Sequence, residues 1–232
     1  MTSKLESAFE TMAAHAAENL LKNGDTLGLG SGSAVARFAK ALGERVKKEA
    51  LKISVIPSSM QSFLLASQNG LEFSKDTAHS PETIDVAIDG ADQISLPTRS
   101  MIKGGGGALL KEKIIISSSK KCYILGDDSK FVDALLRSVP VEVTQFSYLS
   151  TGSMIRRKYG AETILRKLEK GYPYYSESGN VILDCQLKSA IADPKILERE
   201  IKSIPGVVEC GIFNEKVEAF YRANRDGSFD SL

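Results

Sequence analysis

Apolar positions in the N-terminal part of the chain follow two alternating patterns. Short apolar runs predict buried strands at 26–30, 53–56, 85–88 and 122–125. Before and between these runs, apolar residues recur every three or four positions, which predicts amphipathic helices at 5–20, 35–46, 60–68 and 109–117. Strands that alternate with amphipathic helices are typical of an α/β protein with a mostly parallel sheet covered on both faces.

The pattern changes after about Arg137. The apolar segments that follow predict the order strand, helix, strand, strand, helix, strand, over residues 139–143, 146–159, 162–165, 180–185, 194–203 and 207–213. This β-α-β-β-α-β order is that of a ferredoxin-like unit. A further strand is predicted over 217–222. Topology alone therefore places a domain boundary near Arg137.

Composition and charge are those of an ordinary globular protein. Of the 232 residues, 42% are hydrophobic and 25% are charged, and 30 basic against 29 acidic residues give a net charge of +1. This balance argues against a general nucleic-acid or membrane-surface binder. No run approaches the ~20 apolar residues of a membrane span, and the amphipathic start does not resemble a signal peptide. We expect a cytoplasmic protein with neither nucleic acid nor membrane as partner.

Cysteine and histidine are scarce in this chain. The three cysteines, Cys122, Cys185 and Cys210, lack the spacing of a disulfide framework or a zinc site. The two histidines are His15, which we expect to have a structural role in the first helix, and His79, in a polar loop. Without a cluster of such ligands we expect no tightly held metal.

Polar or glycine-rich turns follow four predicted strands, at the sheet edge where α/β proteins bind ligands. The first is GSGS, Gly30 to Ser33, which leads into a helix. Glycines allow close approach of a ligand, and the N–H groups of a helix N-terminus attract an anion. The Ser33 hydroxyl adds a donor. A tight turn with a serine N-cap explains the same residues equally well.

The second turn carries two aspartates, Asp89 and Asp92, in the sequence DGAD. Two carboxylates three residues apart can converge on one small molecule, where they hold sugar hydroxyls or exchange protons. Binding of Mg²⁺ would need further acidic ligands nearby. An aspartate-rich turn without a function is an equal alternative, because Asp and Gly both favour turns.

The third turn contains four consecutive glycines, Gly104 to Gly107, directly before an apolar helix. Ordering such a run is entropically costly, which favours close contact between backbone and ligand over a flexible hinge. Lys103 before the run can supply a cation to a developing oxyanion. Glu112 follows in the helix, where the charged neighbours Lys111 and Lys113 indicate a solvated face.

The fourth turn is GDDSK, residues 126–130, after the predicted strand 122–125. One interpretation is that this turn caps a following helix. The other is that it places the basic side chain of Lys130 in the same cleft as the other turns.

Taken together, these motifs closely resemble the type A ribose-5-phosphate isomerase family. The matching segments are GLGSGS, IPSS, AIDGADQI, IKGGGGALLKEKI, LGDDSK, PVEV, SGNVILD and IPGVVECGIF, in this order over nearly the whole chain. The resemblance implies a Rossmann-like domain, residues 1–137 and 214–232, with an inserted α+β ferredoxin-like domain, residues 138–213. It also implies conversion of D-ribose 5-phosphate to D-ribulose 5-phosphate without a cofactor, in the non-oxidative pentose phosphate pathway. A homodimer or homotetramer is expected by the same resemblance.

The resemblance further implies a role for each motif. Glu112 is the general base, Asp89 is linked to opening of the sugar ring, and Asp92 and Lys103 contact the sugar oxygens. The phosphate is held by Ser31, Gly32, Ser33 and Ala34, together with Lys130. The remaining substrate-binding residues are Gly90, Ala91, Gly104, Gly105 and Gly106.

The implied chemistry agrees with the residues available. A carboxylate that removes the C2 proton and returns it to C1 interconverts an aldose and a ketose through an enediolate. A cation or a row of N–H groups stabilises the oxyanion. No metal or nicotinamide is required.

Three positions depart from the family pattern. Ala34 stands where the family usually has threonine, Gln93 where it usually has an acid, and Phe9-Glu10 where it often has a lysine. We expect Gln93 to make a structural contact. The two weakened phosphate contacts predict a raised KM, since a lost hydrogen bond to a charged group costs about 1–3 kcal/mol.

Two other functions are compatible with the same fold. An aminosugar-phosphate deaminase or a sugar lactonase should carry a catalytic histidine, but neither His15 nor His79 lies in a candidate turn. A non-catalytic sugar-phosphate sensor usually carries a DNA-binding helical domain, for which we expect residues 1–25 to be too few. The presence of Glu112 and Lys103 favours an enzyme.

Overall fold

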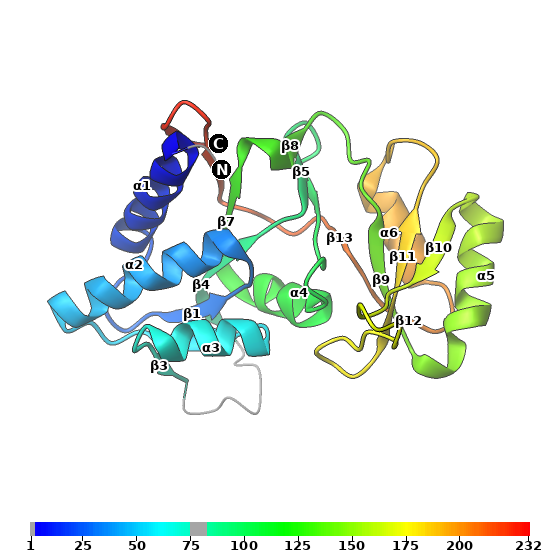
Figure 1. The fold of residues 1–232 in the computed structure, drawn as a ribbon, viewed down its shortest axis with the longest axis horizontal. Coiled ribbons are helices and arrows are strands. Elements are labelled where there is room, and N and C mark those ends of the chain that lie inside the picture. Colours follow the sequence, from blue (N-terminus) through cyan, green and yellow to red (C-terminus); the bar gives the residue numbers. More distant parts are fainter. Residues whose placement is uncertain (1–2, 75–82) are drawn as a thin grey trace. The chain divides into compact units, whose positions relative to one another are not determined.

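The computed structural model describes residues 3–74 and 83–232 (Figure 1). The chain divides into two compact units. Unit 1 comprises Met1–Gly90, Glu112–Lys130 and Lys216–Leu232, and unit 2 comprises Ala91–Lys111 and Phe131–Glu215. This division differs from the expected domain limits in the segments 91–111, 131–137 and 214–215, which belong to unit 2. The strands of the first two segments pair with one another and with a later strand of that unit.

Unit 1 is built on a mostly parallel sheet, as predicted. Among the described residues its seven strands have the order β15-β14-β7-β4-β1-β2-β3. Their bounds are β1 Thr26–Leu29, β2 Ser54–Pro57, β3 Glu72–Phe73, β4 Ile84–Gly90, β7 Ser119–Asp127, β14 Ala219–Ala223 and β15 Phe229–Ser231. Only the pair β14–β15 is antiparallel within this described sheet.

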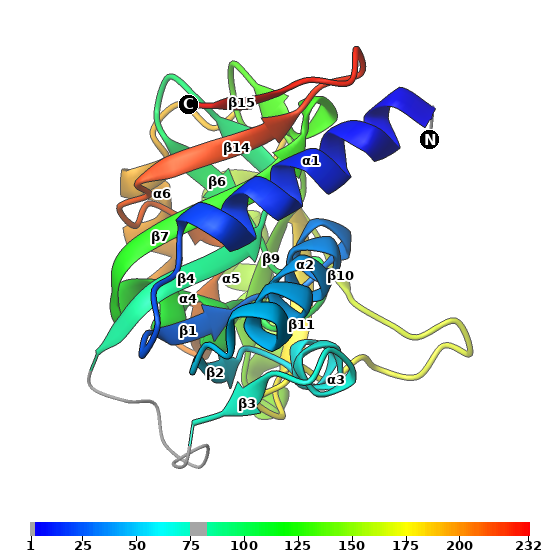
Figure 2. The ribbon, with the colours of Figure 1, turned by 90° about the vertical axis from the view of Figure 1, so that its left-hand side faces the viewer.

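Helices cover both faces of this sheet (Figure 2). On one face lie α1 (Ser3–Asn19), α2 (Ser33–Glu49) and α3 (Met60–Gln68), and on the other lies α4 (Leu109–Ser117). The buried side chains of α1 and α2 form one core with alternate residues of the strands, such as Leu27 and Leu29 of β1. Burial of this apolar face is what holds α1 and α2 on the sheet.

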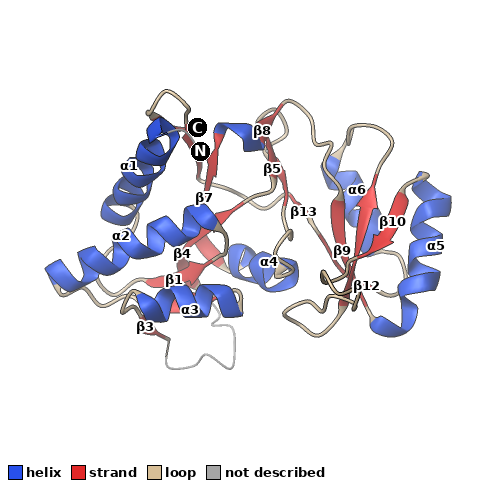
Figure 3. Cartoon of the chain, in the orientation of Figure 1, coloured by secondary structure: helices blue, strands red, loops and turns tan. Residues whose placement is uncertain are grey.

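Unit 2 contains an antiparallel sheet with the order β10-β11-β9-β12 (Figure 3). Its elements follow one another as β9 Val139–Val143, α5 Tyr148–Tyr159, β10 Glu162–Leu165, β11 Val181–Gln186, α6 Pro194–Lys202 and β12 Val207–Cys210. Helix α5 packs on β10 and β11, and α6 packs on β12. This is the predicted β-α-β-β-α-β order and is consistent with a ferredoxin-like unit.

A second small sheet of unit 2 has the order β13-β6-β5-β8. Its strands are β5 Gln93–Ser95, β6 Ser100–Ile102, β8 Phe131–Val132 and β13 Ile212–Phe213. The sequence predicted one strand over 207–213, but the chain divides it into β12 and β13 at Gly211. The Gly211 N–H donates to Pro140 O at 2.7 Å, while Gly211 O accepts from Lys103 N at 2.9 Å. Gly211 therefore marks the point where the chain passes from one sheet to the other.

The three cysteines are buried, and His15 lies in the first helix, as the sequence predicted for that histidine. Cys122, Cys185 and Cys210 are buried free thiols, and burial raises the pKa of Cys185. His15 lies in α1, with its ring centroid 5.2 Å from that of Phe229. His79 lies outside the described residues. In the part of the chain that is described, no helix is long and apolar enough to cross a membrane.

Replacement of Gly211 by alanine should destabilise the protein. An added Cβ would lie 2.6 Å from Lys103 O and 2.8 Å from Pro140 O, so backbone must move to accommodate it. Overpacking of this kind costs about 1–3 kcal/mol, which corresponds to a fall in Tm of about 2–10 °C. Thermal unfolding followed by circular dichroism measures the effect, with the exposed Ser189→Ala as control. An unchanged Tm in Gly211→Ala would show that the backbone at Lys103 and Pro140 can move apart to accept the Cβ without loss of stability.

Candidate active site

The loop between β1 and α2 in unit 1 exposes backbone that suits an anion. Gly32 occupies the N-cap of α2 with φ 96°, and no side chain caps the helix. The expected alternative of a serine N-cap is therefore wrong. Gly32 and Ser33 are exposed, whereas Ala34 is buried. The positive end of the α2 dipole thus lies at Gly32, beside which an added Cβ would meet only open space.

Asp89, at the carboxyl end of β4, approaches this loop closely. Its side chain is only 3% exposed. Its Oδ1 accepts hydrogen bonds from Gly90 N at 2.7 Å and from Ser31 N at 3.2 Å. A Cβ at Gly30 would lie 1.9 Å from this oxygen. Gly30 therefore allows the buried carboxylate to reach the loop.

Glu112, in the first turn of α4, joins the same loop. Its Oε1 accepts a hydrogen bond from Ser31 Oγ at 3.0 Å. Residue spacing predicted a solvated face here, and that expectation is wrong, because Glu112 is 3% and Lys113 is 4% exposed. Only Lys111 of this charged triplet is exposed. Ser31 thus binds both carboxylates, Asp89 through its N–H and Glu112 through its hydroxyl.

Unit 2 brings together Asp92 and the glycine run. Asp92 Oδ2 accepts a hydrogen bond from Gly105 N at 2.8 Å. Gly104 and Gly107 adopt φ values of 98° and 82°, a region that disfavours other residues. Lys103, directly before the run, is 2% exposed, and its Nζ lies 5.4 Å from the centroid of the Phe213 ring. The lysine ammonium is therefore a charge held away from bulk water.

The remaining predicted binding residues lie in turns after two strands of unit 1 or directly beyond them. Gly90 ends β4 and Ala91 follows it as the first residue of unit 2. Lys130 ends the short 3₁₀ helix Asp128–Lys130 after β7 and is half-buried. It makes no salt bridge within residues 3–74 and 83–232. In the same described ranges, no three His, Cys, Asp or Glu side chains form a group that could hold a metal ion.

Two of the departures from the family pattern have structural explanations. Gln93 Oε1 accepts hydrogen bonds from Leu136 N at 2.7 Å and Arg137 N at 2.9 Å, which confirms the expected structural contact. Glu10 of α1 lies 3.4 Å from the Arg37 guanidinium of α2. This position therefore carries an ion pair between helices instead of a basic residue.

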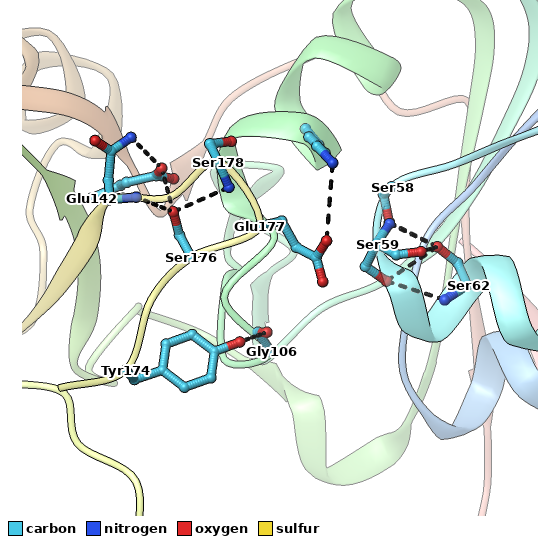
Figure 4. Close-up of polar contacts among 11 residues, drawn as sticks. Ser58, Ser59, Ser62, Gly106, Glu142, Tyr174, Ser176, Glu177 and Ser178 are labelled. Carbon is cyan, nitrogen blue, oxygen red and sulfur yellow. Dashed lines mark hydrogen bonds and ion pairs between the residues drawn. The ribbon is translucent and has the colours of Figure 1, made fainter. Parts of the chain in front are cut away.

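A network of serines, whose contacts the sequence analysis did not predict, lies at the start of α3 (Figure 4). Ser58 and Ser62 are fully buried, and Ser59 and Ser62 form a capping box at the start of α3. Gln61, in the first turn of this helix, accepts a hydrogen bond from Gly32 N at 3.3 Å. The capped helix thus places an amide against the loop. The IPSS segment of the family pattern includes Ser58 and Ser59, but nothing in the sequence indicated the contact with Gly32.

Two further side chains hold the glycine run. Arg166 Nη1 donates to Gly104 O at 2.8 Å and to Gly105 O at 3.0 Å. Tyr174 donates its hydroxyl hydrogen to Gly106 O at 2.8 Å (Figure 4). Burial raises the pKa of Tyr174, so its hydroxyl remains a donor. Both residues come from the polar segment 166–180, where no motif pointed to them.

Comparisons with known proteins agree with the motifs. A family model described as ribose 5-phosphate isomerase A (phosphoriboisomerase A) matches residues 54–227. The ribose-5-phosphate isomerase A of Methanosarcina acetivorans is 40% identical over 96% of this chain and 93% of its own length.

Solved structures show the same fold. Ribose 5-phosphate isomerase A from Methanocaldococcus jannaschii has a TM-score of 0.89 and 33% identity, covering 98% of each chain. A D-ribose-5-phosphate isomerase in complex with phospho-erythronic acid has a TM-score of 0.88 and 33% identity, covering 97% of each chain. The family match and the identity over nearly the full chain lead to one conclusion: this chain belongs to the ribose 5-phosphate isomerase A family.

Proposed function

We propose that this chain interconverts D-ribose 5-phosphate and D-ribulose 5-phosphate through an enediolate, with Glu112 as the general base. The observation that carries the proposal is a carboxylate that is 3% exposed and accepts a hydrogen bond from Ser31. The same serine holds Asp89 by its N–H. A base must be oriented and protected from bulk water, and both conditions are met here. Family membership supports the reaction class.

In the proposed reaction, Asp89 assists opening of the sugar ring, which exposes the C1 aldehyde. Glu112 then removes the proton on C2, and the electrons of that bond form the C1–C2 double bond while O1 becomes an oxyanion. The proton of the C2 hydroxyl passes to O1, which becomes the C1 hydroxyl, and Glu112 returns its proton to C1 as the C2 carbonyl forms. A positioned base contributes about 10²–10⁴-fold and an oxyanion donor about 10²–10³-fold. In this proposal Lys103 and Asp92 contact the sugar oxygens.

The phosphate is proposed to bind the loop of Ser31, Gly32, Ser33 and Ala34, at the N-terminus of α2. The exposed Gly32 backbone and the uncapped helix end support this assignment. Lys130, which has no ion-pair partner in the described residues, supplies a positive charge. The other proposed substrate contacts are Gly90, Ala91, Gly104, Gly105 and Gly106.

Phospho-erythronic acid, bound in the related structure, is a useful probe of this proposal. It has a phosphate like the substrate, and its planar anionic carboxylate resembles an enediolate. A site that stabilises the enediolate should therefore bind it better than the ground-state sugar. A homo-oligomer in the cytoplasm, acting in the pentose phosphate pathway, completes the proposal.

Replacement of Glu112 by glutamine should reduce kcat by at least about 10²-fold, because the amide cannot accept the C2 proton. Proton NMR of ribose 5-phosphate in D₂O with excess EDTA measures ribulose 5-phosphate formation and deuterium incorporation at carbon together. Binding of phospho-erythronic acid should persist. The exposed Glu169→Gln serves as the matched control. Near-wild-type turnover in Glu112→Gln would remove this residue from the mechanism, and binding without any turnover in the wild type would favour a sensor.

Replacement of Ala34 by threonine should lower KM for ribose 5-phosphate by about tenfold or more, because a hydrogen bond to a charged group contributes about 1.5–3 kcal/mol. The position lies in the first turn of α2, at the proposed phosphate. Initial-rate kinetics should show little change in kcat. Ala36→Thr, in the same helix, is the control and should leave KM unchanged. If Ala34→Thr also leaves KM unchanged, this loop does not bind the phosphate.

A further inference from the structure

The carbonyl oxygens of all four glycines in the run are bound by one segment of unit 2. Gly104 O and Gly105 O accept from Arg166, and Gly106 O accepts from Tyr174. Gly107 O accepts from Glu177 N at 3.3 Å. We call these three donors, the Arg166 guanidinium, the Tyr174 hydroxyl and the Glu177 N–H, the carbonyl clamp. A glycine run has great conformational freedom, so four bound carbonyls in succession restrict it strongly.

Fixing the carbonyls also fixes the direction of the N–H groups. In a trans peptide unit the C=O and the following N–H point in opposite directions. The unit that joins Gly104 to Gly105 shows this directly, because its oxygen binds Arg166 while its N–H binds Asp92 Oδ2 at 2.8 Å. The next unit likewise has its oxygen on Arg166, which turns the Gly106 N–H away from the clamp. The clamp therefore sets the direction of the Gly105 and Gly106 N–H groups, the first of which binds Asp92, whereas the Gly107 N–H closes a turn onto Gly104 O at 3.0 Å.

Three contacts within unit 2 hold the clamp in place. The Arg166 guanidinium pairs with Asp184 of β11, with Nε 2.9 Å from Oδ2. The ring of Tyr174 packs on Gly107, where an added Cβ would lie 2.4 Å from its Cε1.

The third anchor is the turn that carries Glu177 (Figure 4). Its Ser176 and Asn180 donate to Oε1 of Glu142 at 2.6 Å and 2.9 Å. Glu142 lies on the central strand β9 and is fully buried. A buried carboxylate requires such donors, so this turn is held firmly in place.

We propose that Arg166 and Tyr174 are positioning residues for the sugar oxygens: they hold the carbonyl side of the glycine run so that its N–H side and Asp92 are preorganised. The inference rests on the proposed isomerase function and deepens it. Neither residue touches the substrate in this account. Preorganised donors act where charge develops in the transition state, and they need no reorganisation at that moment. Loss of the clamp should therefore lower kcat more than it raises KM.

Tyr174→Phe tests the proposal, because it removes only the hydroxyl that binds Gly106 O. The adjacent Tyr175→Phe is the matched control, since Tyr175 is exposed and its hydroxyl makes no hydrogen bond in the described structure. In Tyr174→Phe we expect kcat for ribose 5-phosphate to fall about five- to tenfold, with KM changed less than about twofold. Affinity for phospho-erythronic acid should fall by a factor similar to that for kcat. Tyr175→Phe should match the wild type in all three.

Amide hydrogen exchange of residues 104–108, followed by mass spectrometry, separates the possible outcomes. Faster exchange in Tyr174→Phe together with the loss in kcat supports the proposal. Faster exchange with unchanged kcat, or unchanged exchange, overturns it. An equal loss in Tyr175→Phe also overturns it, because the effect would then belong to the whole segment.

The measurements also distinguish failure of the proposed isomerase function from failure of the positioning role. If the wild type does not isomerise ribose 5-phosphate but binds phospho-erythronic acid, the affinity ratio between Tyr174→Phe and wild type still decides whether the clamp positions the ligand. If the wild type does neither, the clamp has no ligand of this class to position and the inference fails with the function.

Discussion

The hydrogen bonds of Ser31 are the interaction on which the candidate site in unit 1 depends. Asp89 and Glu112 are both almost fully buried, and a buried carboxylate without donors is costly. Ser31 provides one donor to each, its N–H to Asp89 and its hydroxyl to Glu112. This arrangement requires a residue without a side chain at position 30, because Asp89 occupies the space that a Cβ would take. One short turn therefore orients two acidic groups and leaves the N-terminus of α2 open beside them.

The glycine run of unit 2 is also held by hydrogen bonds, but here the backbone carbonyl oxygens are the acceptors. Four glycines allow the backbone to adopt positive φ at Gly104 and Gly107, but they also make it flexible. Carbonyl oxygens that are bound by Arg166, Tyr174 and the Glu177 backbone remove that flexibility. The run thus keeps the close approach that only glycine permits and still presents its N–H groups in fixed directions. A run of four glycines can therefore be rigid in the folded protein, because the groups that bind its carbonyl oxygens come from a distant segment of the same unit.

The parts of the fold that could be predicted from sequence are those set by burial of continuous apolar faces. Strands such as β1 and β4 and the helices α1 and α2 have periodic apolar residues and were placed within a few positions. The two-residue strands β3, β8 and β13 have no such period, since they form only when distant partners pair with them. The break between β12 and β13 at Gly211 has the same origin, because it depends on backbone hydrogen bonds from Gly211 to Lys103 and Pro140, which are distant in the chain.

The site shows the same division between local and distant causes. Asp89, Asp92 and the glycine run stand out because turns have a recognisable composition. The charged neighbours of Glu112 predicted an exposed side chain, but the side chain is buried. Its proposed role as a base was implied only by the family resemblance. Arg166 and Tyr174 carry no local signal, because their partners lie more than sixty positions away in the chain.

The electrostatics of Lys103 follow from these same non-local contacts. Its backbone is fixed at Gly211, and its side chain is 2% exposed beside the face of Phe213. In surroundings of low dielectric constant, the charge of an ammonium acts on a nearby anion more strongly than in water. In the proposed reaction, an enediolate oxygen is the anion that gains from such a charge, whereas the uncharged carbonyl oxygen of the open-chain sugar phosphate gains little. Under the proposed mechanism, a buried lysine and preorganised N–H groups would therefore favour the transition state over the ground state, which is the condition for catalysis.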